Sequence, residues 1–166
     1  IETPIVLFTY VNPVARMGVA AFVRAAVDAG VDGVLLLDLP IEESDTMHAA
    51  LDAAGLDQIF LISPTTSEAL LRQAARMGRG FLYAISRLGV TGVQSAVAGT
   101  AKPVVDAIRA VTPMPVALGF GIARPEHVRE ACAYADAAVV GSALVQVIAD
   151  APPGQAAADA ERFVRW

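Results

Sequence analysis

The sequence has little of several residue types that carry function, and each shortage excludes a class of protein. Cys132 is the one cysteine, so an intrachain disulfide is excluded, and no Cys or His residues have metal-site spacing. Lysine also occurs once, the net charge is −5 and the arginines are scattered. The chain thus lacks the basic face that nucleic-acid binding requires. We therefore expect neither a structural metal nor a nucleic-acid partner.

Long hydrophobic runs are also absent, although the chain is apolar as a whole. Hydrophobic residues make up 55% of the 166 residues and charged residues 17%. No run approaches the roughly 18 to 20 apolar residues of a membrane-spanning helix. The first residues show neither a basic region nor an apolar signal with a cleavage site. We expect one large core, no membrane segment and a cytoplasmic location.

Six short apolar runs bounded by turn residues are candidate strands. They are continuous rather than alternating, which is typical of strands buried on both faces in a parallel sheet covered by helices. The runs cover residues 5–10, 33–38, 58–63, 80–86, 115–119 and 135–141.

Between these runs, apolar residues recur at helical spacing, and each stripe predicts a helix that packs on the sheet. The stripes cover residues 19–27, 47–54, 70–77, 104–111 and 128–135, with a final helix at about 155–166. Cys132 falls on the fifth stripe, which predicts a packed side chain. The boundary signals are Ser67 as a cap, Pro103 and Pro125 as first-turn prolines, and Gly30, Gly55 and Gly78 after helix ends.

The repeating unit is a strand followed by a helix. The segments AGVD at 29–32 and AGLD at 54–57 each close a helix and open a strand, 25 residues apart. This alternation implies a parallel sheet, either doubly wound or closed as a barrel, and the pattern alone does not choose. A barrel of eight units takes about 250 residues. Length therefore suggests one domain, residues 1–166, holding about six units of an incomplete TIM (β/α)8 barrel.

Ligands of parallel α/β folds bind beyond the carboxyl ends of the strands. Here the last three strand ends carry glycine, at 89–92, 119–121 and 141, and the third leads into a short apolar helix. Tight turns alone would explain one such site, whereas three in succession favour a phosphate cradle of backbone amides. The loop at 89–102 is either a lid over a substrate or a solvated loop.

Few side chains are candidates for acid or base chemistry. Asp38 at a strand end is the best of them, although Asp-x-Pro is equally a turn device. Glu42 and Glu43 begin a predicted helix, where the helix dipole favours negative charge. His48 and His127 fall within helices near exposed faces, and neither is a catalytic candidate.

Five motifs together closely resemble the tryptophan synthase alpha chain family. They are YVNP at 10–13, DLPIEES at 38–44, SRLGVTG at 86–92, GFGI at 119–122 and GSALV at 141–145. The likeness runs in order through nearly the whole chain. It implies a TIM-barrel lyase of tryptophan biosynthesis that cleaves indole-3-glycerol phosphate to indole and glyceraldehyde 3-phosphate. It further implies no cofactor on this chain and an alpha2-beta2 complex, in which indole passes to a pyridoxal-phosphate beta chain.

The resemblance also implies roles for individual residues. The phosphate-binding positions are Gly92, Gly121, Gly141 and Ser142, the substrate site includes Tyr83 and Phe120, and Thr91 is the lid threonine. The segments facing the beta chain contain Tyr10, Asn12, Asp38 and Pro40. The family's catalytic glutamate and aspartate belong to elements that would precede Ile1. We therefore assign no catalytic residue and expect the chain alone to be inactive or nearly so.

Two other hypotheses stay open. Another phosphate-binding TIM-barrel enzyme of amino-acid or sugar-phosphate metabolism would share the glycine cradle and bind a sugar phosphate. A non-catalytic partner-binding module would instead need covered sheet edges, since an open barrel exposes two strands to aggregation.

Overall fold

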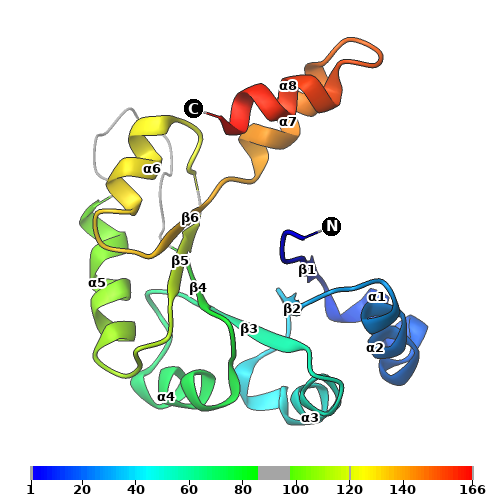
Figure 1. Ribbon diagram of the computed structural model, residues 1–166. Helices are drawn as coiled ribbons and strands as arrows, with labels where there is room; N and C mark the ends of the chain where they lie inside the picture. The colour runs from blue at the N-terminus through cyan, green and yellow to red at the C-terminus, as the bar shows by residue number, and fades with distance from the viewer. Residues whose placement is uncertain (1, 86–97, 120, 166) are drawn as a thin grey trace.

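The computed structural model describes residues 2–85, 98–119 and 121–165, in which six parallel strands form one sheet in chain order. Figure 1 shows this sheet curving as part of a ring, with helices α2 to α6 on its outer side. The predicted strands are all confirmed, with ends that differ by at most two residues. They are β1 Val6–Thr9, β2 Gly33–Leu36, β3 Asp57–Ile62, β4 Leu82–Ile85, β5 Val116–Gly119 and β6 Ala137–Val139.

The helices alternate with the strands as predicted, and the fold class is that of an incomplete α/β barrel. Within the described residues β1 and β6 are the edge strands, each with one neighbour. None of the described helices is long and apolar enough to cross a membrane. The helices are α1 Val11–Met17, α2 Val19–Asp28, α3 Asp45–Ala53, α4 Glu68–Met77, α5 Ala98–Arg109, α6 Pro125–Ala131, α7 Ser142–Asp150 and α8 Ala156–Val164, with a 3-10 turn η1 at Ile41–Glu43.

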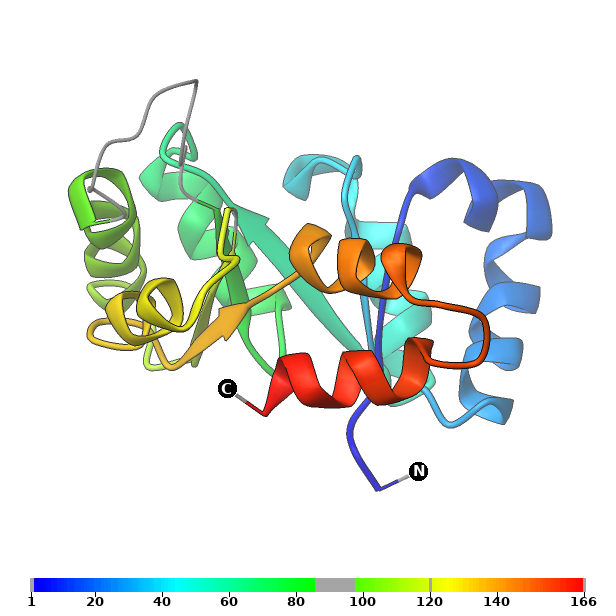
Figure 2. The same cartoon turned by 90° about the horizontal axis from the view of Figure 1, so that it is seen from above.

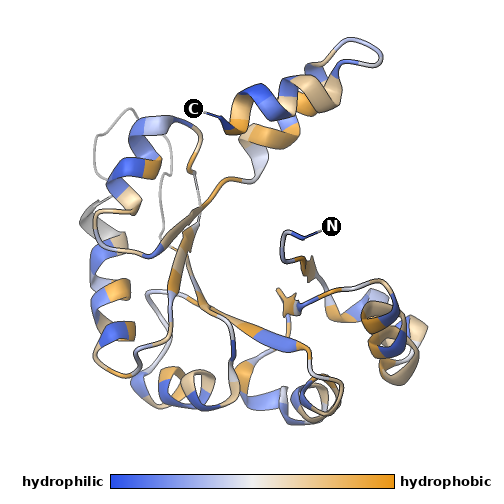
Figure 3. Ribbon diagram, in the orientation of Figure 1, coloured by the Kyte–Doolittle hydropathy of each residue, from blue (hydrophilic) through white to orange (hydrophobic). Residues whose placement is uncertain are grey.

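The core lies between the sheet and the outer helices, in two clusters. Val34 and Leu36 of β2 pack with Leu51 of α3 in the first. The second holds the outward side chains of β3, β4 and β5 against α4 and α5, including Leu118 and Ile108. Figure 3 shows mostly hydrophobic strands and helices of mixed hydropathy. Burial of each large side chain contributes about 1.5–3 kcal/mol.

The inner face of the sheet is less uniformly covered. Leu35 and Ile59 are buried there, each with 2% exposure. On β1, however, Val6 and Phe8 retain 37% and 58% exposure. The concave side near β1 is therefore an apolar surface open to solvent.

Aspartates that precede two strands reach across to the start of the neighbouring strand. Asp32 Oδ2 accepts a hydrogen bond from the Ile5 amide at 2.7 Å. Asp136 Oδ2 likewise accepts from the Val116 amide at 2.8 Å and pairs with Arg109 at 3.1 Å. The Val116 amide, and then Arg109, hold the pKa of Asp136 below its ordinary value. Asp32, which closes the first repeated segment, and Asp136 thus help to align adjacent units.

Most of the predicted helix boundaries are confirmed. Ser67 Oγ accepts from the Leu70 amide at 3.4 Å, and Pro125 is the first residue of α6. Gly30 and Gly55 both have a φ of +73°, which L side chains rarely adopt. Gly78 also follows its helix, but at an ordinary φ of −68°.

Three expectations about the helices are wrong, and one helix was missed. Pro103 lies inside α5, as its sixth residue, and not in its first turn. The fifth stripe ends at Ala131, and Cys132 caps α6 with an exposed side chain, because the chain turns before that position reaches the core. Glu42 and Glu43 belong to the 3-10 turn, and α3 begins only at Asp45. The helix α1 was not predicted, because its one buried residue, Val14, leaves no apolar stripe.

Truncation of the core should cost far more stability than the same change at the surface. Ile108 is fully buried, whereas Ile148 on α7 is 44% exposed. Ile108→Ala should lower the free energy of unfolding in urea by about 2–5 kcal/mol, and Ile148→Ala by much less. Equal losses for the two variants would contradict the assignment of the core.

The Asp136 contacts should make stability depend on pH. Because the folded-state pKa is depressed, the carboxylate stabilises the fold above its unfolded pKa of about 4 and loses this contribution as pH falls further. Asp136→Asn should therefore lower the urea midpoint at pH 7 and have little effect near pH 2. Urea titrations of both proteins at the two pH values measure this, and a difference that persists at pH 2 would count against it.

Candidate functional site

The carboxyl ends of the strands lie at one edge of the sheet, because every neighbouring pair is parallel. Gly119 of β5 pairs with Val139 of β6. The chain therefore leaves these strands at the same level, and the loops with Gly121 and Gly141 start next to each other. In Figure 2 the carboxyl ends of the strands lie on the upper side of the ribbon.

The two glycines have different backbone requirements. Gly121 has a φ of +72°, so the left-handed turn itself favours glycine there. Gly141 has a φ of −113°, and a Cβ at this position would meet no atom within 4 Å. Neither a left-handed turn nor packing within the described chain explains Gly141, which suits a position kept clear for a ligand.

Helix α7 starts at this open position. The amides of Leu144 and Val145 donate to the Gly141 carbonyl at 2.9 and 3.1 Å. The amides of Ser142 and Ala143 come before them and have no acceptor in the described part of the chain. These two donors and the helix dipole favour an anion above β6.

Tyr83 lies on the inner face of β4 and crosses over Gly119 of the next strand. A Cβ on Gly119 would collide with the phenol oxygen and come within 2.5 Å of Cζ of Tyr83. Only glycine therefore leaves room for the ring in this position. The role of Gly119 was missed in the sequence, because only the neighbouring strand shows what its Cβ would hit.

The ring of Tyr83 on β4 also contacts the ring of Phe8 on β1, on the concave face of the sheet. The ring centroids are 6.1 Å apart at an interplanar angle of 53°. Burial raises the pKa of the Tyr83 hydroxyl, so the group stays neutral and can donate a hydrogen bond. The pair forms an aromatic wall with one polar end, which suits a ligand with a flat apolar ring. Phe8 is a further residue that the sequence analysis did not single out.

Asp38 has a structural partner rather than a catalytic one. Its Oδ1 accepts a hydrogen bond from the Val11 amide at 2.7 Å, at the start of α1. This agrees with the alternative of a backbone-bonding aspartate, although the amide is 27 residues away in sequence. The bond joins the loop after β1 to the loop after β2.

That bond brings together the two segments expected to face a partner. Tyr10 is 54% exposed, and Asn12, Asp38 and Pro40 are exposed as well. The four residues thus occupy one accessible region above β1 and β2.

Other expected site residues lie outside the description. Thr91, Gly92 and Phe120 are not among the described residues, and neither is most of the loop at 89–102. Within the described ranges, no group of three or more His, Cys, Asp or Glu side chains could hold a metal ion.

Comparison with known proteins points to one family. The family model described as "Tryptophan synthase alpha chain" matches residues 1–165. The chain is 49% identical to the tryptophan synthase alpha chain of Geotalea uraniireducens over 146 residues, which are 88% of this chain and 55% of the relative. With the Burkholderia thailandensis protein of the same name, identity is 44% over 163 residues, covering 98% and 60%.

Solved structures agree. The tryptophan synthase complex from Pyrococcus furiosus contains a chain that superposes with a TM-score of 0.86 at 32% identity, covering 99% of this chain and 65% of that one. The chain spans only about 55 to 60% of the length of the two curated relatives. Sequence identity over almost its whole length nevertheless settles its kinship: the chain belongs to the tryptophan synthase alpha chain family.

Proposed function

We propose that this chain forms the phosphate-binding part of a lyase that cleaves indole-3-glycerol phosphate to indole and glyceraldehyde 3-phosphate in tryptophan biosynthesis. Family membership supports this proposal. The observation that carries it is the pair of unpartnered amides at Ser142 and Ala143, within the described chain, beside the open position at Gly141. These donors would hold the phosphate, with Gly121 shaping the adjacent loop. Gly92 belongs to the proposed cradle by the family resemblance.

The rest of the substrate would extend from the phosphate across the inner face. Tyr83 offers a neutral hydroxyl and, with Phe8, an aromatic surface against which an indole ring could pack. Phe120 and Thr91 would complete this site by resemblance. Binding of both substrate ends would orient the bond that breaks.

The chemical step needs more than this chain's described residues supply. A retro-aldol cleavage requires an acid that protonates indole C3 and a base at the glycerol hydroxyl. Asp38, the best strand-end carboxylate, is already bonded to the Val11 amide and exposed. We therefore propose binding and orientation as this chain's part and expect indole formation by the chain alone to stay near background.

A beta chain is the proposed partner. Tyr10, Asn12, Asp38 and Pro40 form an accessible region, and Asp38 fixes its two loops together. The relatives of known structure include tryptophan synthase complexes, one of them described as an a2b2 complex. An alpha2-beta2 assembly in the cytoplasm is accordingly part of the proposal. The module hypothesis required covered edges; within the described sheet β1 and β6 each pair with one neighbouring strand.

Substitution of Gly141 should separate phosphate binding from stability. An aspartate at this helix N-cap would accept from the first-turn amides and repel a phosphate, while it stabilises α7. Gly141→Asp should weaken binding of indolepropanol phosphate in calorimetry by about tenfold or more without lowering the urea midpoint. Ala157→Asp, an exposed change of equal charge on α8, is the control.

The same titrations decide between substrates. Binding of indolepropanol phosphate that exceeds binding of ribose 5-phosphate supports the lyase proposal. Tight binding of the sugar phosphate alone would favour the other barrel enzymes. If neither ligand binds, or if Gly141→Asp binds like the parent, the proposed phosphate site is wrong.

The contact between Tyr83 and Gly119 should appear as coupling between two substitutions. Gly119→Ala forces the ring to move and should cost about 1–3 kcal/mol of unfolding free energy. In a Tyr83→Ala background the added methyl group has room, so the same substitution should cost much less. A double-mutant cycle from urea unfolding measures the difference, and purely additive effects would show that the two residues do not touch.

A further inference from the structure

Arg124 differs in its partner from the basic residues that form salt bridges in the described part of the chain. Salt bridges to carboxylates hold six basic side chains in the described residues, those of Arg72, Arg79, Lys102, Arg109, Arg162 and Arg165. The guanidinium of Arg124 instead contacts Nε2 of His127, at 3.2 Å from Nε and 2.9 Å from a terminal nitrogen. An imidazole carries no negative charge. The positive charge of Arg124 is therefore held in place by His127 without being neutralised by it.

The position of this charge is as informative as its partner. Arg124 is exposed in the connection between β5 and α6, three residues after Gly121. The described connections after β3 and β6, residues 63–67 and 140–141, contain no basic residue. Arg124 thus places a cation at the edge of the sheet where the proposed phosphate cradle lies.

The hydrogen bonds of His127 also bear on the cradle. A guanidinium can only donate, so Nε2 of His127 accepts from Arg124. The Ala123 amide lies 3.3 Å from Nδ1. An anion at the cradle would neutralise the charge of Arg124, which His127 leaves uncompensated.

We propose that Arg124 is a specificity-determining residue for the phosphate group of the substrate, and that His127 is the residue that positions it. This inference rests on the proposed function and adds a charged contact to a cradle otherwise made of backbone amides. A guanidinium forms charge-assisted hydrogen bonds with phosphate oxygens and matches their geometry. Arg124 therefore favours a phosphate over an uncharged group of similar size.

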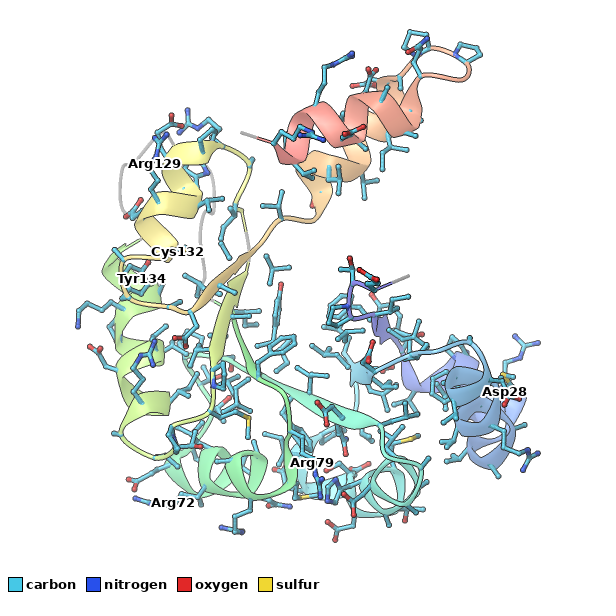
Figure 4. The ribbon with its side chains drawn as sticks, viewed as in Figure 1. Asp28, Arg72, Arg79, Arg129, Cys132 and Tyr134 are labelled. Carbon is cyan, nitrogen blue, oxygen red and sulfur yellow. The ribbon has the colours of Figure 1, made fainter. Side chains whose placement is uncertain are left out.

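Calorimetric titration with glycerol 3-phosphate at low and high salt tests the role of Arg124. Arg124→Gln should weaken binding by about tenfold and reduce its dependence on salt, because one charge pair is lost. Arg129→Gln is the control, since Arg129 is exposed in the last turn of the same helix (Figure 4). It should change the affinity by less than about twofold.

Variants of His127 test positioning. His127→Ala should weaken binding by about threefold with the urea midpoint unchanged, and His127→Gln, whose side-chain oxygen can accept from Arg124, should restore part of the affinity. If the parent chain binds glycerol 3-phosphate and Arg124→Gln binds it equally well with the same salt dependence, this inference is wrong and the proposed function stands. If the parent chain does not bind the ligand, the proposed phosphate site fails, and this inference with it.

Discussion

Parallel main-chain pairing between successive strands is the interaction on which the site depends. Because Gly119 pairs with Val139, the loops after β5 and β6 leave the sheet at one level. The amides at the start of α7 then lie beside the turn at Gly121. Packing of Leu118, Ile108 and their neighbours between sheet and helices keeps this register rigid. The same strands thus carry both the core residues and the residues that position the site.

Aspartate side chains have different roles at the amino and carboxyl ends of the strands. Asp32 and Asp136, before their strands, accept hydrogen bonds from the neighbouring strand and align the units. Asp38, after its strand, bonds to the Val11 amide and joins two exposed loops. The edge with the carboxyl ends thereby carries two separate regions, a proposed phosphate site above β5 and β6 and a proposed partner region above β1 and β2.

In the proposed phosphate site the positive charge comes mainly from backbone dipoles, which suits a chain with a net charge of −5. Arg124 is a side-chain addition to that arrangement, kept available because a neutral ring rather than a carboxylate holds it. The aromatic pair of Phe8 and Tyr83 supplies the apolar part. These elements come from β1, β4, β5 and β6, which only the curvature of the sheet brings to one concave side (Figure 1).

The sequence by itself determined the unit repeat, the six strands and the family, because continuous apolar runs, helical stripes and five spaced motifs are local patterns. It also located Gly121, Gly141 and Ser142 at strand ends. Only the tertiary structure decided what depends on contacts between distant segments: that Tyr83 excludes a Cβ at Gly119, that Asp38 binds Val11, and that Cys132 is exposed. No local pattern encodes these facts, since each depends on which strand or helix lies next to the residue.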